Sequence, residues 1–310
     1  MENRLLTRER LERMIEARDA AEARKLLAEC GYADGVGLEQ ALAQAREDTF
    51  RDLEGAVPDP GLLQVFQVKY DYHNAKVLLK ARAVGADPER LLLAGGRYPA
   101  GELLEGWRRG ELQECSPAFQ RALEESRAAL EESHDPQQAD LILDRACYGE
   151  MAQLARETGS AFLQGYVRLS VDVANLRTAV RVHRMGRDGE FLRQALLPGG
   201  NVSPQTVAAA RGDGLEEVFR AGALARAAQL GARLTQPESG PLTEFERECD
   251  NALTAYLAAA RRIPFGEQVV IGYLYAREQE LTAIRSVFAG RAAGLDGDTI
   301  RSRLRQTYVE

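Results

Sequence analysis

The sequence has no long apolar run, no cluster of cysteines and no excess of basic residues. No stretch approaches the roughly 20 apolar residues that a membrane-spanning helix needs, so we expect a protein that is soluble or peripheral to a membrane. The net charge of -7 over 310 residues excludes a globally basic surface for nucleic acid or for an anionic membrane. The opening segment, MENRLLTRERLERMIEARDAAEARKLL, is charged throughout, so we expect no signal peptide there.

Motifs that bind metals, nucleotides or cofactors are also missing. No CxxC, HExxH or GxxxxGK(S/T) occurs, and no GxGxxG follows a strand pattern. The carboxylate-rich stretches 46–54 and 124–135 are interpreted as solvated helix faces. We therefore expect no metal, no cofactor and no small-molecule substrate. The cysteines lie far apart, which is typical of small buried side chains in a reducing, intracellular location: Cys30, Cys115, Cys147 and Cys249.

What the sequence does contain is a helical pattern along almost its whole length. Ala, Leu, Arg and Glu dominate, and these are strong helix formers. The best strand candidate, residues 268–276, runs directly into a helical pattern and is interpreted as the start of a helix. The sequence therefore predicts an all-α protein.

Capping residues mark where several of these helices begin and end. Four capping side chains stand immediately before a proline: Asp87, Ser116, Asp135 and Ser203. Thr243 and Glu246 have the spacing of a capping box. Three glycines are predicted to end helices: Gly85, Gly186 and Gly290.

One helical stretch occurs three times. NAKVLLKARAVG (74–85), NLRTAVRVHRMG (175–186) and QELTAIRSVFAG (279–290) have the same length and end in glycine, at offsets of 101 and 104 residues. The first two copies continue alike through residues 93–110 and 197–214. Each of these contains a glycine pair, which is interpreted as a turn that needs positive φ. Each repeat also follows another helical segment: 38–57, 140–159 and 242–262.

The repeat predicts three copies of one helical unit, at 1–115, 116–220 and 221–310. Solenoid proteins stack repeats of about 20–45 residues in a line. A much longer repeat that is present three times favours a closed, pseudo-symmetric body instead.

Charged residues recur in register between the copies. Lys80, Arg181 and Arg285 share one position of the repeat, and Asp71 and Asp172 share another. These residues either form salt bridges within the protein, which contribute little when exposed, or line a socket that receives a partner. All five are retained as candidate partner-contact residues.

Asp71 and His73 are the best candidates for catalysis, but their spacing is unfavourable. Residues two apart on a helix do not face each other, and no Ser or Cys nucleophile lies near in sequence. The equivalents of His73 in the other copies are Ala174 and Glu278. We therefore predict no catalytic residue. A hydrolase or metal enzyme that uses this pair, and a helical adaptor of an unrelated assembly, remain as alternatives.

The segment KYDYHNAKVLLKARAVG resembles the C subunit of the bacterial and archaeal A/V-type ATPases, a family related to the d subunit of the eukaryotic V-type enzyme. Four further segments carry the same resemblance: LDRACYGEM (143–151), VDVANLRTAVRVHRMG, LLPGGNVSP and the C-terminal YLYAREQELTAIRSVFAGRAAGLDGDTIRSRLRQTYV. The resemblance covers nearly the whole chain. Each segment alone is weak evidence, but their combination is specific.

The resemblance implies a funnel-shaped, all-helical body of three similar units about a pseudo-three-fold axis. It also implies a rotor subunit with no active site of its own. Such a subunit lies at the cytoplasmic face of the membrane, on the proteolipid rotor ring, and receives the foot of the central shaft, which is built from the D and F proteins. It transmits torque between ATP chemistry in the head and H⁺ or Na⁺ movement in the membrane.

One feature departs from the family. Its members begin with an extra helix rich in Tyr, Ala and Arg, whereas this chain starts close to RLLTRERLERMIEA. We therefore expect the first helix of the family to be missing. The choice between H⁺ and Na⁺ is made in the ring and stator subunits, and this sequence carries no signal for it.

Overall fold

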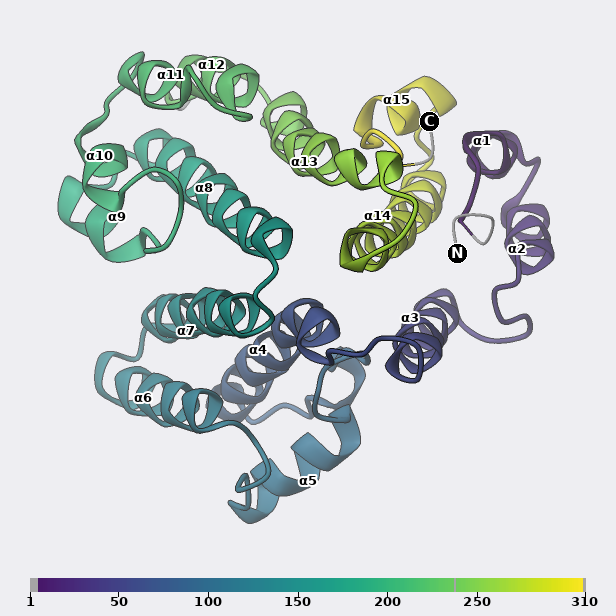
Figure 1. The fold of residues 1–310 in the computed structure, drawn as a ribbon, viewed down its shortest axis with the longest axis horizontal. Helices are drawn as coiled ribbons and strands as arrows, with labels where there is room; N and C mark the ends of the chain where they lie inside the picture. The colour runs from purple at the N-terminus through teal and green to yellow at the C-terminus, as the bar shows by residue number, and fades with distance from the viewer. Residues whose placement is uncertain (1–4, 237, 309–310) are drawn as a thin grey trace. The chain divides into compact units, whose positions relative to one another are not determined.

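The computed structural model describes residues 5–236 and 238–308, so the first four residues of the charged opening segment lie outside it. Every regular element within these ranges is a helix, which confirms the all-α prediction (Figure 1). The α-helices are α1 (Arg8–Glu16), α2 (Ala20–Glu29), α3 (Leu38–Glu54), α4 (Gly61–Val84), α5 (Ala100–Arg109), α6 (Pro117–Ser133), α7 (Pro136–Glu157), α8 (Ala161–Arg184), α9 (Gly189–Ala195), α10 (Pro204–Ala209), α11 (Gly214–Phe219), α12 (Ala225–Arg233), α13 (Thr243–Ala258), α14 (Glu267–Ala292) and α15 (Gly297–Arg303). Two 3₁₀ turns, η2 (Glu89–Leu91) and η3 (Ala259–Arg262), follow α4 and α13.

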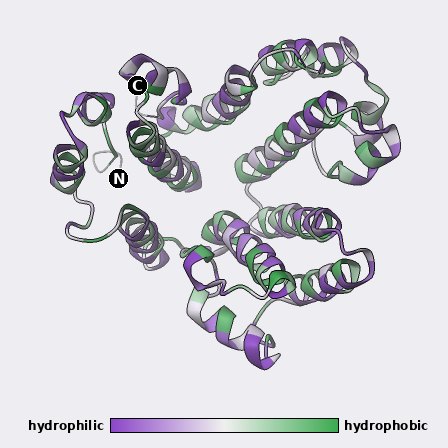
Figure 2. Ribbon diagram, turned by 180° about the vertical axis from the view of Figure 1, so that it is seen from behind, coloured by the Kyte–Doolittle hydropathy of each residue, from purple (hydrophilic) through white to green (hydrophobic). Residues whose placement is uncertain are grey.

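The three repeat stretches lie in the three longest helices, α4, α8 and α14. Hydrophilic and hydrophobic residues alternate closely along the ribbons of the long helices (Figure 2). α4 buries 14 of its 24 residues, and α8 buries 13 of 24. A surface helix has a single apolar stripe, so these helices are enclosed on more than one face. Within the described residues no helix is both long and apolar enough to cross a membrane.

Most of the predicted helix starts are confirmed. Ser116 accepts a hydrogen bond from the backbone N–H of Phe119, with Pro117 as the first residue of α6. Asp135 caps α7 in the same way, and Ser203 accepts from the N–H of Thr206 at the start of α10. Residues 268–276 lie in the first turns of α14, as predicted.

The predicted capping box at Thr243 is wrong. Thr243 is already the first helical residue of α13, and the N-cap position is held by Leu242, whose side chain accepts no hydrogen bond. The backbone of Leu242 is in the αR region, so the chain enters this helix through a preceding turn and not from an extended capping residue.

Two of the three predicted glycine stops are confirmed. Gly85 and Gly186 have φ of 66° and 64°, the left-handed conformation that ends many helices. Gly290 is different, because α14 continues through it to Ala292. A Cβ at position 290 would lie 2.8 Å from Cγ1 of Ile300, so this glycine allows α15 to pack closely against α14.

The chain divides into two compact units. Unit 2 comprises residues 54–182 and 187–209. In it, α7 packs between α4 and α6. The ring of Phe66 stacks on Tyr166 with centroids 5.3 Å apart, and Tyr72 and Tyr98 both contact Phe119.

Unit 1 combines both ends of the sequence: its described residues are 5–53, 183–186, 210–236 and 238–308. Helices α1 and α2 pack on α14. The guanidinium of Arg291 donates to the carbonyl oxygens of Ile15 and Ala17 at the end of α1. One apolar cluster joins the two ends: Leu11, Met14, Leu27 and Leu42 with Leu281, Ile284, Val287 and Ile300. The division into three units at residues 115 and 220 stays a prediction.

Candidate functional site

Asp71 of α4 is buried and binds the loop that follows its own helix. Its carboxylate accepts from Nε of Arg97 at 2.6 Å and from the backbone N–H of Tyr98 at 3.4 Å. Three residues further along α4, the amide of Asn74 forms two hydrogen bonds with the backbone of Leu93, at 2.9 and 2.8 Å. The two side chains together fix residues 93–98 to the helix.

The same arrangement is built again on α8. Asp172 accepts from the backbone N–H groups of Asn201 and Val202, both at 3.1 Å, and from the Asn201 side chain at 2.7 Å. Asn175 forms two hydrogen bonds with the backbone of Leu197, both at 2.8 Å. We call these the first loop clamp (Asp71, Asn74 and residues 93–98) and the second loop clamp (Asp172, Asn175 and residues 197–202).

The two glycines of each pair have different roles. Gly95 and Gly199 have φ of 94° and 96°, which confirms the turn prediction. Gly96 and Gly200 instead allow a close approach, because an added Cβ would lie 2.3 and 2.2 Å from the aspartate Oδ1 of its clamp. Sequence reasoning missed this role. The signal was available, since both copies contain the Asp and Asn at an offset of 101 residues and a Gly-Gly pair at an offset of 104.

The first loop clamp continues into a buried charge network that the sequence did not reveal. Arg97 also donates through Nη1 to Glu150 of α7 at 2.8 Å. Glu150 accepts two further hydrogen bonds, from the hydroxyls of Ser116 at 2.6 Å and Tyr72 at 2.9 Å. One guanidinium therefore joins two buried carboxylates that lie 79 positions apart in the sequence.

Burial acts differently on the two carboxyl groups. It raises the pKa of Asp71 to about 6, although the guanidinium of Arg97 pulls in the opposite direction. Burial also acts to raise the pKa of Glu150, but its hydrogen bonds from Arg97, Ser116 and Tyr72 outweigh this, and the pKa is lowered. The network is a structural ion cluster that holds a loop.

The arrangement does not assemble the hypothetical catalytic pair. Asp71 directs its carboxylate to the loop, whereas His73 is exposed on α4. No group of three or more His, Cys, Asp or Glu side chains with metal-binding geometry occurs within the described ranges.

The predicted partner-contact residues fall into two groups. Asp71 is 0% exposed and Asp172 4% exposed, and both carboxylates are used by their loops. A side chain without accessible surface offers nothing to a partner in this conformation, so burial argues against these two. Lys80, Arg181 and Arg285 all have exposed surface and stay candidates.

Lys80 and Arg285 form ion pairs at equivalent places. Nζ of Lys80 lies 2.7 Å from Asp140 near the start of α7, and Arg285 binds Glu39 near the start of α3 through two hydrogen bonds of 2.9 and 2.7 Å. Glu39 and Asp140 are 101 residues apart, the offset of the first two copies. Each pair is partly exposed and contributes at most about 1 kcal/mol.

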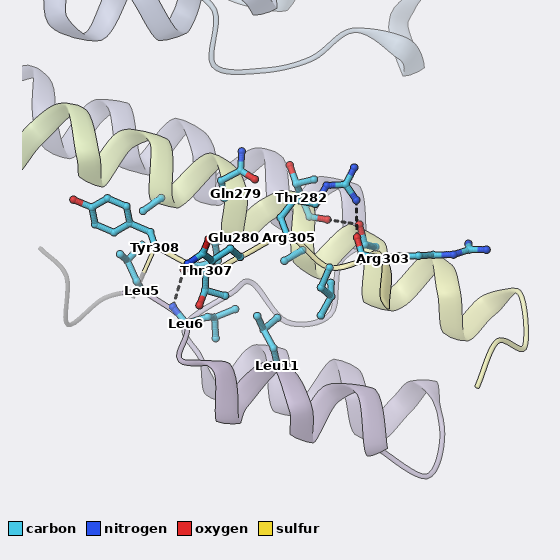
Figure 3. A pocket seen from close by; sticks show the side chains of 15 residues that line it. Leu5, Leu6, Leu11, Gln279, Glu280, Thr282, Arg303, Arg305, Thr307 and Tyr308 are labelled. Atoms are coloured by element: carbon cyan, nitrogen blue, oxygen red, sulfur yellow. Dashed lines mark hydrogen bonds between the residues drawn. The ribbon is translucent and has the colours of Figure 1, made fainter. Parts of the chain in front are cut away.

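The third copy lacks a loop clamp. Ala276 and Gln279 of α14 occupy the positions of the clamp aspartate and asparagine. Residues 304–308, which we call the C-terminal strap, cover this face of α14 together with the N-terminal segment and leave a small cavity (Figure 3). Its walls include Leu5, Leu6 and Leu11 from the N-terminal segment, Gln279 and Glu280 from α14, and Thr307 and Tyr308 from the strap.

The C-terminal strap is attached mainly through α13 and through its final aromatic ring. Arg305 pairs with Asp250 at 2.9 Å, and the N–H of Gln306 donates to Asn251 at 3.0 Å. The buried Tyr308 packs against Gly272 of α14.

Replacing Gly272 by Ala is expected to release the strap, because the new Cβ would lie 2.3 Å from Oη of Tyr308. Amide hydrogen exchange of residues 304–308 should accelerate at least tenfold, while overall stability changes little, since alanine favours the helix by about 1 kcal/mol. The matched variant Gly101→Ala, at a helical glycine with no atom within 4 Å, should leave strap exchange unchanged. Unchanged exchange in Gly272→Ala would contradict this account of the attachment.

The described residues form an all-helical protein, in which recurring polar side chains hold loops to the long helices. A family model described as ATP synthase (C/AC39) subunit matches residues 1–303. The chain therefore belongs to this family, as the resemblance predicted.

Individual relatives agree with the family assignment. The chain is 24% identical over 271 residues to the C subunit of the V-type sodium ATPase of Enterococcus hirae, a match that covers 87% of this chain and 82% of the relative. It is 26% identical over 290 residues to the C subunit of the A-type ATP synthase of Haloferax volcanii, covering 86% and 79%. The C subunit of the V-type ATP synthase of Thermus thermophilus is 30% identical over 144 residues, 42% of each chain.

Proposed function

We propose that this chain is the central-stalk rotor subunit of an A/V-type ATPase. It links the D–F shaft to the proteolipid ring and transmits torque for ATP-coupled H⁺ or Na⁺ transport, without catalysis of its own. In this role it is peripheral to the membrane, on the cytoplasmic side. The observation that carries the proposal is the family match over residues 1–303, together with relatives named as the C subunit of V-type and A-type enzymes.

The interior of the protein suits torque transmission. A part that passes on torque must not deform under load, and close-packed interiors have low compressibility. The loop clamps and the Arg97 network add buried hydrogen bonds that fix connecting loops to the long helices. A loop held at several points gives a partner a surface of constant shape.

The C-terminal ends of α4 and α8 are suited to partner contact. Four residues after Lys80, on the same face of α4, lies Val84, which is 78% exposed. Met185, which is 59% exposed, follows directly after the end of α8 and four residues after Arg181. Both segments therefore contain an exposed cation and an exposed apolar side chain, a combination that suits a protein surface with acidic and apolar groups.

The first experiment is a pull-down of this chain with co-expressed D and F shaft proteins from the same source, followed by an ATPase assay of the isolated chain. We expect stoichiometric binding and no turnover. Intrinsic ATP hydrolysis, or absence of binding by a folded full-length chain, would overturn the proposal. Binding to a different assembly would instead support the adaptor hypothesis.

Reversing the charge of Lys80, Arg181 and Arg285 together is expected to weaken binding to the D–F shaft by at least tenfold. Charged groups at an interface set the electrostatic complementarity of the partners and the rate at which they meet. The variant carries Lys80→Glu, Arg181→Glu and Arg285→Glu, and its affinity for the D–F complex is measured by interferometry. A matched control reverses Arg109, Arg193 and Arg220, which are exposed and paired within their own helices or helix ends. Equal affinity of wild type and variant, with an unchanged circular dichroism spectrum, would remove these residues from the interface.

A further inference from the structure

The two loop clamps differ in one chemical respect. The second clamp contains a single carboxylate, Asp172, whose partners are the neutral Asn201 and backbone N–H groups. In the first clamp Arg97 stands at the position of Asn201, and it brings a second carboxylate, Glu150, into the same cluster. The first cluster therefore holds two buried negative charges and one positive charge, on an Arg97 side chain that is 10% exposed.

A buried cluster with one uncompensated negative charge is costly, and binding one proton removes that cost. Geometry indicates which carboxyl group takes the proton. Glu150 receives three hydrogen bonds of 2.6 to 2.9 Å, each of which favours its charged form. Asp71 receives one short hydrogen bond, from Nε of Arg97, and longer backbone contacts from the N–H groups of Arg97 and Tyr98, the latter at 3.4 Å, and it has no exposed surface.

Apart from Arg97 and Glu150, the titratable groups around Asp71 are uncharged near neutral pH. Burial raises the pKa of the Cys115 thiol to about 11 and that of the Cys147 thiol to about 12, and it raises the pKa of Tyr98. The titratable and charged groups that face Asp71 are Arg97 and Tyr98 on the loop, Glu150 and Cys147 on α7, and Cys115 ahead of α6.

We propose that the first loop clamp, but not the second, is a pH-sensitive device whose hold on residues 93–98 weakens as the pH rises. When the loop opens, water solvates Asp71 and its carboxyl becomes an ordinary acid. The closed clamp binds the proton more tightly than the open one does, so protonation favours the closed clamp. The inference is independent of the rotor assignment, because it concerns a local equilibrium within one unit.

The size of the effect follows from linkage. The pKa of Asp71 in the closed clamp is about 6, against an ordinary value of 3.8. One pKa unit corresponds to a tenfold change in an equilibrium. The loop-opening equilibrium should therefore increase by on the order of tenfold to a hundredfold as the pH rises from below the ordinary value to above the closed-state pKa of about 6.

The test is amide hydrogen exchange of the intact chain between about pH 4 and pH 8, corrected for the intrinsic pH dependence of exchange. Residues 93–98 should lose protection with rising pH, at least tenfold more than residues 197–202 in the same sample. The two loops are matched in length and in their Asn anchors, so the second serves as an internal control. Equal behaviour of both loops overturns the proposal.

Two variants assign the titrating group. In Asp71→Asn the pH dependence of residues 93–98 should disappear, because no proton can be gained at that position. In Glu150→Gln the charges of Asp71 and Arg97 cancel, so residues 93–98 should lose their protection at a lower pH than in the wild type. If Asp71→Asn keeps the wild-type dependence while Glu150→Gln abolishes it, Glu150 is the titrating group and the proposal is wrong. If a variant does not fold, the comparison of residues 93–98 with residues 197–202 in the wild type still tests the proposal.

Discussion

Replacing Arg97 by Met is expected to destabilise the protein by about 3–5 kcal/mol, the cost of leaving buried charge without its partner. The guanidinium is 10% exposed and bridges Asp71 and Glu150, so its removal leaves two facing carboxylates in the interior. Methionine fills a similar volume, and the loss is therefore mainly electrostatic. Urea denaturation followed by circular dichroism at pH 7 measures the change in free energy of unfolding.

The pH dependence of this variant separates charge from packing. Without Arg97 both carboxyl groups should have a folded-state pKa above the unfolded value. The folded state then binds protons more tightly, so the variant should regain stability as the pH falls towards 5 and lose it as the pH rises through the folded pKa. A defect of equal size at pH 5 and pH 7 would indicate lost packing instead. The control Arg193→Met removes an exposed pair with Glu190 and should change stability by no more than about 0.5 kcal/mol.

Replacing Gly200 by Ala is expected to cost about 1–3 kcal/mol, the usual range for overpacking a close contact. The added Cβ would lie 2.2 Å from Oδ1 and 3.1 Å from Cγ of Asp172, and 3.2 Å from Cγ1 of Val171. The carboxylate cannot move away without losing its hydrogen bonds to Asn201 and Val202. Thermal unfolding of the variant measures this loss of stability. Gly96→Ala should cause a similar loss through the first loop clamp.

A double-mutant cycle tests whether the clash is with the aspartate. In an Asp172→Ala background the extra cost of Gly200→Ala should largely vanish, giving a coupling energy close to the single-variant cost. The control Gly149→Ala lies in α7 with no atom within 4 Å of the added Cβ. It should stabilise the protein by roughly 0.5–1 kcal/mol, because alanine is the better helix former. Additive costs of the two clamp substitutions would contradict the steric account.

Local signals in the sequence predicted a large part of this structure. The capping residues Ser116, Asp135 and Ser203 act within three positions of themselves, so their pattern predicts the helix start directly. The repeat predicted the three long helices, because copies that share a fold must keep the same buried positions. The Asp, Asn and Gly-Gly residues that occur in both copies together form the loop clamps.

The rest depended on contacts between distant parts of the chain. No residue near Arg97 or Glu150 in the sequence indicates that these two side chains meet. The second copy gives no hint either, because Asn201 replaces Arg97 there. Gly290 was predicted to end a helix because the glycines at the equivalent positions do so. In the structure it lies within α14, and the close approach of Ile300 is the reason for a glycine there. The sequence allowed Asp71 and Asp172 either to form internal contacts or to contact a partner. Their burial argues for internal contacts, and burial is a property of the packed structure that the sequence does not state.

The composition of unit 1 has a consequence for biosynthesis. The backbone N–H of Leu6 donates to the Glu280 side chain across 274 positions, and Arg301 pairs with Glu12 across 289. On the ribosome these N-terminal helices emerge long before their partners in α14 and α15 exist. The residues of unit 2 are almost continuous, from 54 to 209, and can fold while translation continues. The N-terminal helices of unit 1 can therefore complete their apolar cluster only after α14 and α15 have been synthesised.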